Sequence, residues 1–260
     1  MLGDGFVEAI PDSTLIAISR NQPWDMRGQV IRVPVLEAPG VLRVGRFGWK
    51  NQHASLVSFS ADAYLNEMGI TSPLQPTENT SNGNSVAAFD TVADPEDDGE
   101  DILIFARFMR STKAPARDEA LASTPDAQAG SDTFNQIGCD TCHVRSIRTA
   151  DAGTPINGGA FIVPEALGNK VIHPLSDFLL HDVGTGDGIV QNGGPGTRNK
   201  LRTPPLWGLR THDRLMHDGA SLTLREAILR HDNEAARVVD RFRALNAAER
   251  RELFAFLNSL

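Results

Sequence analysis

The stretch Cys139-Asp140-Thr141-Cys142-His143 has the spacing C-x-x-C-H and contains both cysteines of this 260-residue chain. In c-type cytochromes, two thiols at this spacing are joined to a haem, and the adjacent histidine supplies the proximal iron ligand. The pattern therefore predicts one covalent haem c, attached at Cys139 and Cys142 and ligated by His143.

Other uses of a cysteine pair fit the surrounding sequence less well. A thioredoxin-like redox pair belongs in a strand–helix–strand context, which the sequence around the motif does not suggest. A structural zinc site needs four ligands, and the chain has no second pair of cysteines. A short helical pattern with Ala127, Gly130 and Phe134 precedes the motif, and an apolar helical pattern covers residues 246–260. Both patterns are typical of a cytochrome c domain.

Composition and charge exclude several classes of protein. Hydrophobic residues make up 40% of the chain and charged residues 22%, as in ordinary globular proteins. The net charge of −8 argues against a nucleic-acid partner, which requires a basic surface. No apolar run approaches the ~18–20 residues of a transmembrane helix. The first residues also lack the basic and apolar regions of a secretory signal, although haem c is attached outside the cytoplasm.

Periodicity and capping residues predict a mainly α fold with long loops. Helical patterns cover residues 55–68, 100–110 and 127–137, and two capping boxes, Thr223 with Glu226 and Asn246 with Glu249, predict further helices. Residues 77–98 and most of 150–220 are rich in glycine, proline and polar residues, which predicts loops, and 111–126 is interpreted as a linker.

The second axial ligand of the iron must come from elsewhere in the chain. A lone histidine is more often a hydrogen-bonded structural residue than a ligand, so these residue types alone leave the choice open. The downstream candidates are His173, His181, His212, Met216, His217 and His231.

Several longer stretches resemble the di-haem oxidoreductase family, whose members are labelled peroxidases or thiol oxidoreductases and are related to di-haem cytochrome c peroxidases. The resemblance covers nearly the whole chain. The matching stretches are GRFGWK at 45–50, EMGITSP at 67–73, SDFLLHD at 176–182, LRTPPLWGL at 201–209, LMHDG at 215–219 and LTLREAI at 222–228.

The resemblance implies a cytochrome c-like domain over residues 120–260, preceded over residues 1–115 by the latter part of a second cytochrome c-like domain. Family members carry two C-x-x-C-H motifs, and the single motif here resembles the second one. We therefore expect a C-terminal portion of a longer periplasmic protein, with a second haem and the export signal encoded upstream. A natural mono-haem relative is the alternative.

The resemblance also suggests roles for individual residues. In the related peroxidases, a methionine ligand lies fourteen residues after the histidine of His-Asp-Gly, and the same count from His217 reaches His231. His231 is therefore the expected distal ligand, with His217 as the weaker candidate. Arg202 is a candidate partner for a haem propionate, because a guanidinium suits a carboxylate. An ordinary surface position is the other interpretation of Arg202.

Glu67 resembles the glutamate that assists peroxide cleavage at the first haem of the peroxidases, a role that fits a carboxylate able to move a proton. The glutamine usually found some residues earlier is not matched here. The peroxidases also hold calcium partly through backbone oxygens of a threonine and a proline. This sequence departs from that pattern, with His212 and Arg214 at those positions.

The expected function is electron transfer through the covalent haem to a peroxidase-like site. The expected partners are a small redox protein or another electron donor and a small oxidant such as peroxide. A pure electron-carrier cytochrome without substrate chemistry is the alternative. Thiol oxidation rests on the family label alone.

Overall fold

Capping residues set the starts of the helices that carry the site. The computed structural model describes residues 2–260. Both predicted capping boxes are confirmed: Thr223 and Glu226 cap helix α7, and Asn246 and Glu249 cap helix α9. Ser55 caps α3 by accepting a hydrogen bond from the backbone N–H of Ser58.

The predicted helices over residues 55–68, 100–110 and 127–137 all form, the first as α3 followed by a π-helical turn. None of the helices in the described part of the chain is long and apolar enough to cross a membrane. The helices are α1 (Asp4–Glu8), α2 (Asp12–Asn21), α3 (Leu56–Ala63), α4 (Glu100–Ser111), α5 (Glu119–Ala122), α6 (Pro125–Ile137), α7 (Leu224–Leu229), α8 (Ala236–Ala244) and α9 (Ala247–Asn258).

Short strands accompany the helices, so the fold is mixed, whereas the sequence predicted a mainly α fold without locating these strands. Each strand has two or three residues, and they pair in antiparallel couples: β1 (Arg32–Pro34) with β2 (Leu42–Val44), β3 (Ile147–Arg148) with β6 (Val171–Ile172), β4 (Pro155–Ile156) with β5 (Phe161–Ile162), and β7 (Leu180–His181) with β8 (Leu201–Arg202). Such short strands cannot be recognised in the sequence, because an alternation of apolar and polar residues becomes visible only over four residues or more.

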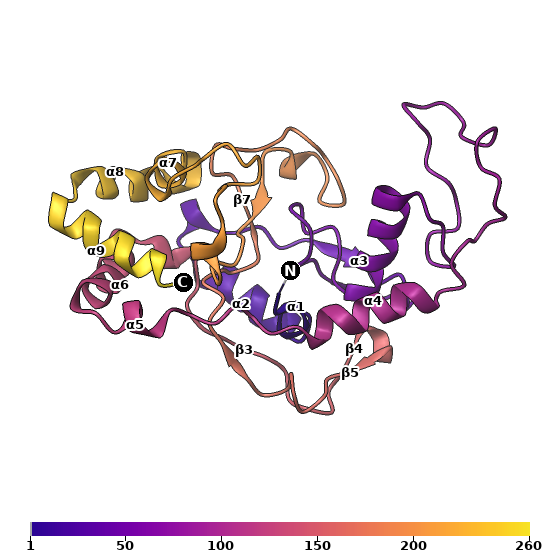
Figure 1. Ribbon diagram of the computed structural model, residues 1–260, viewed down its shortest axis with the longest axis horizontal. Coiled ribbons are helices and arrows are strands. Elements are labelled where there is room, and N and C mark those ends of the chain that lie inside the picture. Colours follow the sequence, from indigo (N-terminus) through magenta and orange to yellow (C-terminus); the bar gives the residue numbers. More distant parts are fainter. Residues whose placement is uncertain (1) are drawn as a thin grey trace.

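The elements spread along the long axis of the molecule (Figure 1). Helices α6 to α9 gather at one end, and α3 and α4 lie at the other, with the loop of residues 77–98 extending beyond them. This loop is largely exposed, as the sequence predicted, and its Phe89 side chain is 86% exposed. The predicted linker of residues 111–126 is partly helical, because α5 and the start of α6 fall within it.

Helices α6 and α9 pack at unusually close range. Their meeting point is Gly130, where an added Cβ atom would lie 1.8 Å from the carbonyl oxygen of Glu252. Phe134 of α6 and Phe256 of α9 stack edge to face beside it, with ring centroids 5.3 Å apart. The absence of a side chain at Gly130 thus allows the two backbones to touch.

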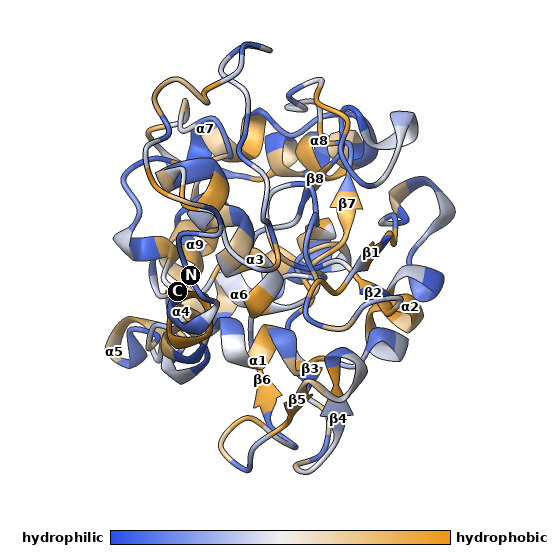
Figure 2. Cartoon of the chain, turned by 90° about the vertical axis from the view of Figure 1, so that its right-hand side faces the viewer, coloured by the Kyte–Doolittle hydropathy of each residue, from blue (hydrophilic) through white to orange (hydrophobic). Residues whose placement is uncertain are grey.

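Two large apolar clusters form the core. One surrounds the α6–α9 contact, and the other joins residues of 7–109 to Ile147, Ile172, Phe178 and Leu179. Strand β7 lies between the two halves and is among the segments coloured as hydrophobic in Figure 2. The segment after the C-x-x-C-H motif therefore packs on the N-terminal part of the chain, across the boundary expected near residue 115.

A buried ionic network ties the N-terminal part together. The Glu8 carboxylate is fully buried and accepts hydrogen bonds from Arg110 Nε (2.6 Å) and Nη2 (2.9 Å), and from Asn157 Nδ2 (3.0 Å). The equally buried Arg46 pairs with Asp12. Since each buried charge has an opposite partner and further hydrogen bonds, its desolvation is offset.

Candidate functional site

Both cysteines lie in a short turn directly after α6. This helix ends at Ile137, where Gly138 adopts a left-handed φ of 94° and terminates it. Residues Cys139–Thr141 then form one 3₁₀ turn, and the backbone N–H of His143 donates to the carbonyl of Cys139 over 3.0 Å. The C-x-x-C-H motif is thus a compact loop that starts at the glycine.

The cysteine side chains are half-buried against the apolar cluster of the α6–α9 end. Burial raises the pKa of Cys139 to about 12, and it also raises the pKa of Cys142. A catalytic redox pair needs a lowered thiol pKa, so this environment disfavours a thioredoxin-like site. Partly exposed apolar neighbours give the sulfurs the setting that a porphyrin requires; these neighbours are Leu206, Leu209, Leu224, Ile228, Leu229, Leu245 and Phe254.

His143 is oriented by a backbone carbonyl. Its Nδ1 atom donates to the carbonyl oxygen of Leu175 over 2.9 Å, which leaves Nε2 with a free lone pair. Leu175 has a left-handed φ of 49°, which is costly for a bulky residue and is commonly found where function demands it. Burial lowers the pKa of His143 to about 4, so the ring is neutral at pH 7.

His231 has the same arrangement. It follows α7, and its Nδ1 donates to the carbonyl of Ala227 over 2.8 Å. Burial lowers the pKa of His231. His231 is also close enough to His143 that a proton on His231 lowers the pKa of His143. Throughout residues 2–260, no group hydrogen-bonds Nε2 of either ring. Two neutral imidazoles therefore have unused lone pairs in the region of the cysteines.

The other candidate ligands are placed differently. His173 is exposed and bonds Ser146, and His212 is also exposed. His217 is half-buried, with its ring 5.9 Å from that of Trp49 and its Nδ1 without a partner among the described residues. Arg214, at the second of the expected calcium positions, is exposed.

Arg202 is not an ordinary surface residue. It is half-buried, its Nε donates to the carbonyl of Gly48 over 3.0 Å, and none of the described carboxylates lies within ion-pair distance of its guanidinium. In the β7–β8 ladder Arg202 is opposite Leu180, whereas His181 is opposite Leu201. Because neighbouring residues of a strand point to opposite faces, Arg202 and His181 lie on different sides of this ladder.

Glu67 lies in the N-terminal part of the fold, directly after α3. It is exposed in the π-helical turn η2 (Tyr64–Met68), which ends at Gly69 with a left-handed φ of 69°. Figure 1 shows α3, which precedes this turn, far from α6 and α9. Single π-helical turns are frequent at functional sites.

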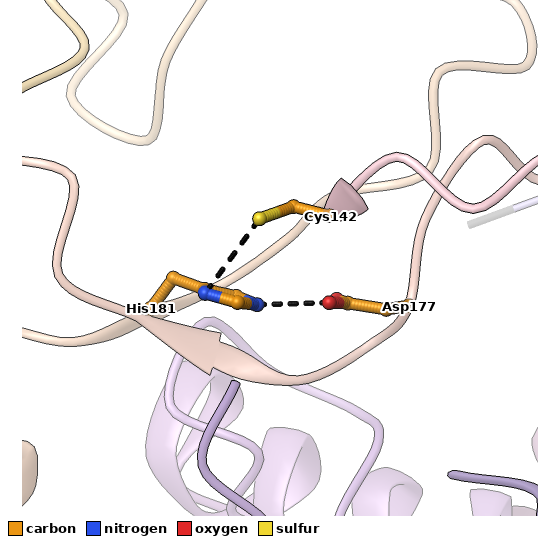
Figure 3. Close-up of side chains that lie close together, drawn as sticks. All are labelled: Cys142, Asp177 and His181. Carbon is orange, nitrogen blue, oxygen red and sulfur yellow. Dashed lines mark hydrogen bonds and ion pairs between the residues drawn. The ribbon is translucent and has the colours of Figure 1, made fainter. Parts of the chain in front are cut away.

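Beside Cys142, His181 forms a buried charged cluster with Asp177 and Glu234. The resemblance to the peroxidases suggested a supporting role near the haem for His181, but it did not predict the two carboxylates. His181 is 2% exposed, with Nε2 2.8 Å from Asp177 Oδ2 and Nδ1 2.7 Å from Glu234 Oε2. Cys142 Sγ is 3.7 Å from Nδ1, so Cys142 and Asp177 lie at opposite edges of the ring (Figure 3). Although burial opposes the shift, Asp177 raises the pKa of His181 well above its ordinary value. Glu234 carries no local sequence signal of this role.

Comparisons with known proteins identify the family. A family model described as "Di-haem oxidoreductase, putative peroxidase" matches residues 1–260. No curated protein matches the chain. Among solved structures, a MauG-like protein associated with microbial copper homeostasis has 18% identity and a TM-score of 0.48, with 83% of this chain and 71% of that chain covered.

Hydrazine synthase from Kuenenia stuttgartiensis has 20% identity and a TM-score of 0.41. The match covers 65% of this chain and 57% of the length of that one. Because these structural likenesses are distant, the assignment rests on the family model, which spans the whole chain and agrees with the C-x-x-C-H motif. Residues 1–260 belong to the di-haem oxidoreductase family, whose description implies a haem cofactor.

Proposed function

We propose that residues 120–260 form a cytochrome c-like domain that binds one covalent haem c through Cys139 and Cys142, with His143 and His231 as the iron ligands. The observation that carries this proposal is the matched pair of imidazoles. Each donates from Nδ1 to a backbone carbonyl and keeps Nε2 unbonded, in the part of the structure that holds both half-buried cysteines. A second hydrogen bond of this kind is what orients ligating histidines in metal sites.

The surrounding residues would hold the haem in a defined position. The haem itself, when bound, supplies the one-electron couple. The carbonyl of Leu175 fixes the tautomer of His143, and the carbonyl of Ala227 does the same for His231. The apolar side chains around the cysteines leave both imidazoles only partly exposed. Arg202, with a half-buried guanidinium and no carboxylate partner in the described chain, is the proposed partner of a haem propionate that reaches the side of the β7–β8 ladder opposite His181.

Two histidine ligands leave no open coordination position for a substrate. This site therefore suits electron transfer, and substrate chemistry has to take place elsewhere or not at all. We propose that it takes place at a peroxidase-like site in a periplasmic di-haem protein, which receives electrons from a small redox protein and reduces a small oxidant such as peroxide. A pure electron carrier is the rival proposal, and the closed site fits it equally well.

The exposed face of α4 supports the di-haem proposal. Its side chains of Leu103, Ile104, Phe105 and Phe108 are each 39% exposed or more, and Tyr64 packs on Phe105 with ring centroids 6.2 Å apart. At the other end of the molecule, α9 has α6 packed against it. We propose that residues 1–115 are the latter part of a first haem domain and that its remaining, haem-bearing segment covers this face.

Loss of the two thiols should abolish covalent attachment. In protein exported with a haem-maturation system, we expect the double variant Cys139→Ala, Cys142→Ala to retain no haem after denaturation, because no thioether can form. Mass spectrometry and the absorbance of the denatured chain measure this. His173→Ala, at an exposed position outside the site, is the matched control and should keep its haem. A denatured wild-type chain without haem would disprove the proposal.

Glu67→Gln should lower peroxide turnover about a hundredfold or more in a protein that contains both haem segments, because an amide cannot carry a proton between the peroxide oxygens. Peroxide-dependent oxidation of a reduced donor measures this effect. Glu100→Gln, at another exposed position of the N-terminal part, is the control and should leave turnover unchanged. If the wild-type protein holds two haems and turns over no peroxide, the electron-carrier alternative replaces the peroxidase-like one.

A further inference from the structure

The buried cluster of Asp177, His181 and Glu234 has a charge state that its geometry dictates. A neutral imidazole donates one hydrogen bond, yet both ring nitrogens of His181 lie within 2.8 Å of a carboxylate oxygen. Only the doubly protonated ring satisfies both contacts. His181 is therefore an imidazolium between two carboxylates. Asp177 and His181 are buried, and Glu234 is partly exposed.

Further groups complete the surroundings of His181. Lys200 Nζ is 3.2 Å from Glu234 Oε1, and Gln22 Nε2 donates to Asp177 Oδ2 over 2.7 Å. Cys142 Sγ, directly after the 3₁₀ turn of Cys139–Thr141, is 3.7 Å from Nδ1. Ligand atoms of Cys142, Asp177 and His181 lie within 4.8 Å of one another, but both ring nitrogens of His181 donate to carboxylates and so have no lone pair for a metal ion (Figure 3). The cluster is therefore an ion network.

The strand that carries His181 is also fastened to the turn that follows His231. The backbone N–H of Asp232 donates to the carbonyl of Val183 over 2.9 Å, and that of Glu234 donates to the carbonyl of Asp182 over 3.1 Å. The carboxylate of Glu234 returns to the N–H of Asp182 over 3.1 Å. His231 is thus anchored on its C-terminal side by the same turn that delivers Glu234 to His181.

The imidazole of His181 has little room to move. An added Cβ at Gly28 would lie 2.6 Å from its Nε2, so the backbone of residue 28 packs directly on the ring. Gln22 links this contact to the cysteine loop, because its Nε2 also donates to the carbonyl of Thr141 over 2.8 Å. The cysteine loop, β7 and the turn after His231 therefore all meet at the imidazolium of His181.

We propose that His181 is a positioning residue of the haem site: bonded to a carboxylate at each ring nitrogen, it fastens the turn that carries His231 to the loop that carries Cys142, and it holds one positive charge beside the thioether position. This inference rests on the proposed haem ligation. It assigns His181 a role other than that of an iron ligand.

Two variants of the haem-loaded protein test the proposal. His181→Asn removes the imidazolium and leaves two buried carboxylates facing each other. Glu234→Gln removes one negative charge: the amide oxygen can still accept from Nδ1, but the amide nitrogen then faces the N–H of Asp182 and the Nζ of Lys200 and cannot accept from either. Since both changes loosen the turn after His231, cyanide should displace this ligand from ferric iron with an apparent Kd about tenfold lower or more in each variant.

The midpoint potential separates positioning from general damage, because the two variants change the local charge in opposite directions. A positive charge near the haem favours the reduced form, so His181→Asn should lower the potential and Glu234→Gln should raise it. His53→Asn is the matched control: His53 is also buried and faces one carboxylate, Asp62 at 3.2 Å, but in the N-terminal part of the fold. It should change neither quantity.

The outcomes distinguish this inference from the proposed function. If the wild-type chain binds no haem, the proposed function fails first. If wild-type iron is bis-histidine and neither variant changes the cyanide affinity or the potential, His181 has no positioning role. If both variants shift the potential in the same direction, the effect is structural damage and the proposal is overturned.

Discussion

Replacing Gly130 by valine should destabilise the protein by about 3 kcal/mol or more, because it forces apart the two most closely packed helices. The Cβ atom alone would lie 1.8 Å from the carbonyl oxygen of Glu252. Because Glu252 is part of α9, its carbonyl cannot move away unless the whole helix moves. Separating α6 from α9 also weakens the contact of Phe134 with Phe256 and exposes the apolar cluster behind the cysteines. Chemical denaturation of the haem-loaded protein, followed by far-UV circular dichroism, measures the loss.

Gln128→Val is the control for this change. Gln128 is exposed on the same helix, so this variant introduces the same β-branched residue into α6 without the steric clash. It should cost well under about 1 kcal/mol. If the two variants unfold at the same denaturant concentration, the close approach of α6 and α9 does not exist in solution.

The sequence predicted the local parts of the fold well. Capping boxes and apolar periodicity depend on residues three or four positions apart, so Thr223, Asn246 and the pattern of residues 100–110 were sufficient to place three helices. The short strands escaped prediction because each pair joins distant segments through only two or three residues. Their stability comes from tertiary packing, for which a single sequence contains no local signal.

The candidate site divides in the same way. A five-residue motif was enough to identify Cys139, Cys142 and His143 as site residues. The attachment of a haem to them stays a prediction. The hydrogen bond from His143 to Leu175 crosses 32 positions of the chain, and that from His181 to Glu234 crosses 53. Contacts of that range depend on how the loops fold over one another. Asp177 and Glu234 therefore became visible only when the geometry placed both carboxylates on one imidazole.

His231→Gly should convert the haem iron from low-spin to high-spin at neutral pH, which is the largest spectroscopic effect that we expect from a single residue. Nε2 of His231 is unbonded in the described structure, and the hydrogen bond from Nδ1 to Ala227 holds the ring in place. The other downstream histidines are less suited to replace it: His173 and His212 are exposed, His181 is committed to two carboxylates, and the ring of His217 packs on Trp49. Visible absorption and electron paramagnetic resonance of the ferric protein measure the change.

Added imidazole should restore the low-spin spectrum of His231→Gly, since the cavity left by the side chain has the size and shape of the missing ring. His231→Met should instead raise the midpoint potential, because a thioether is a weaker donor to ferric iron than an imidazole. His217→Gly is the control and should remain low-spin, because the ring of His217 packs on Trp49. If His217→Gly becomes high-spin while His231→Gly keeps the wild-type spectrum, then His217 is the ligand, and the free Nε2 of His231 has another role.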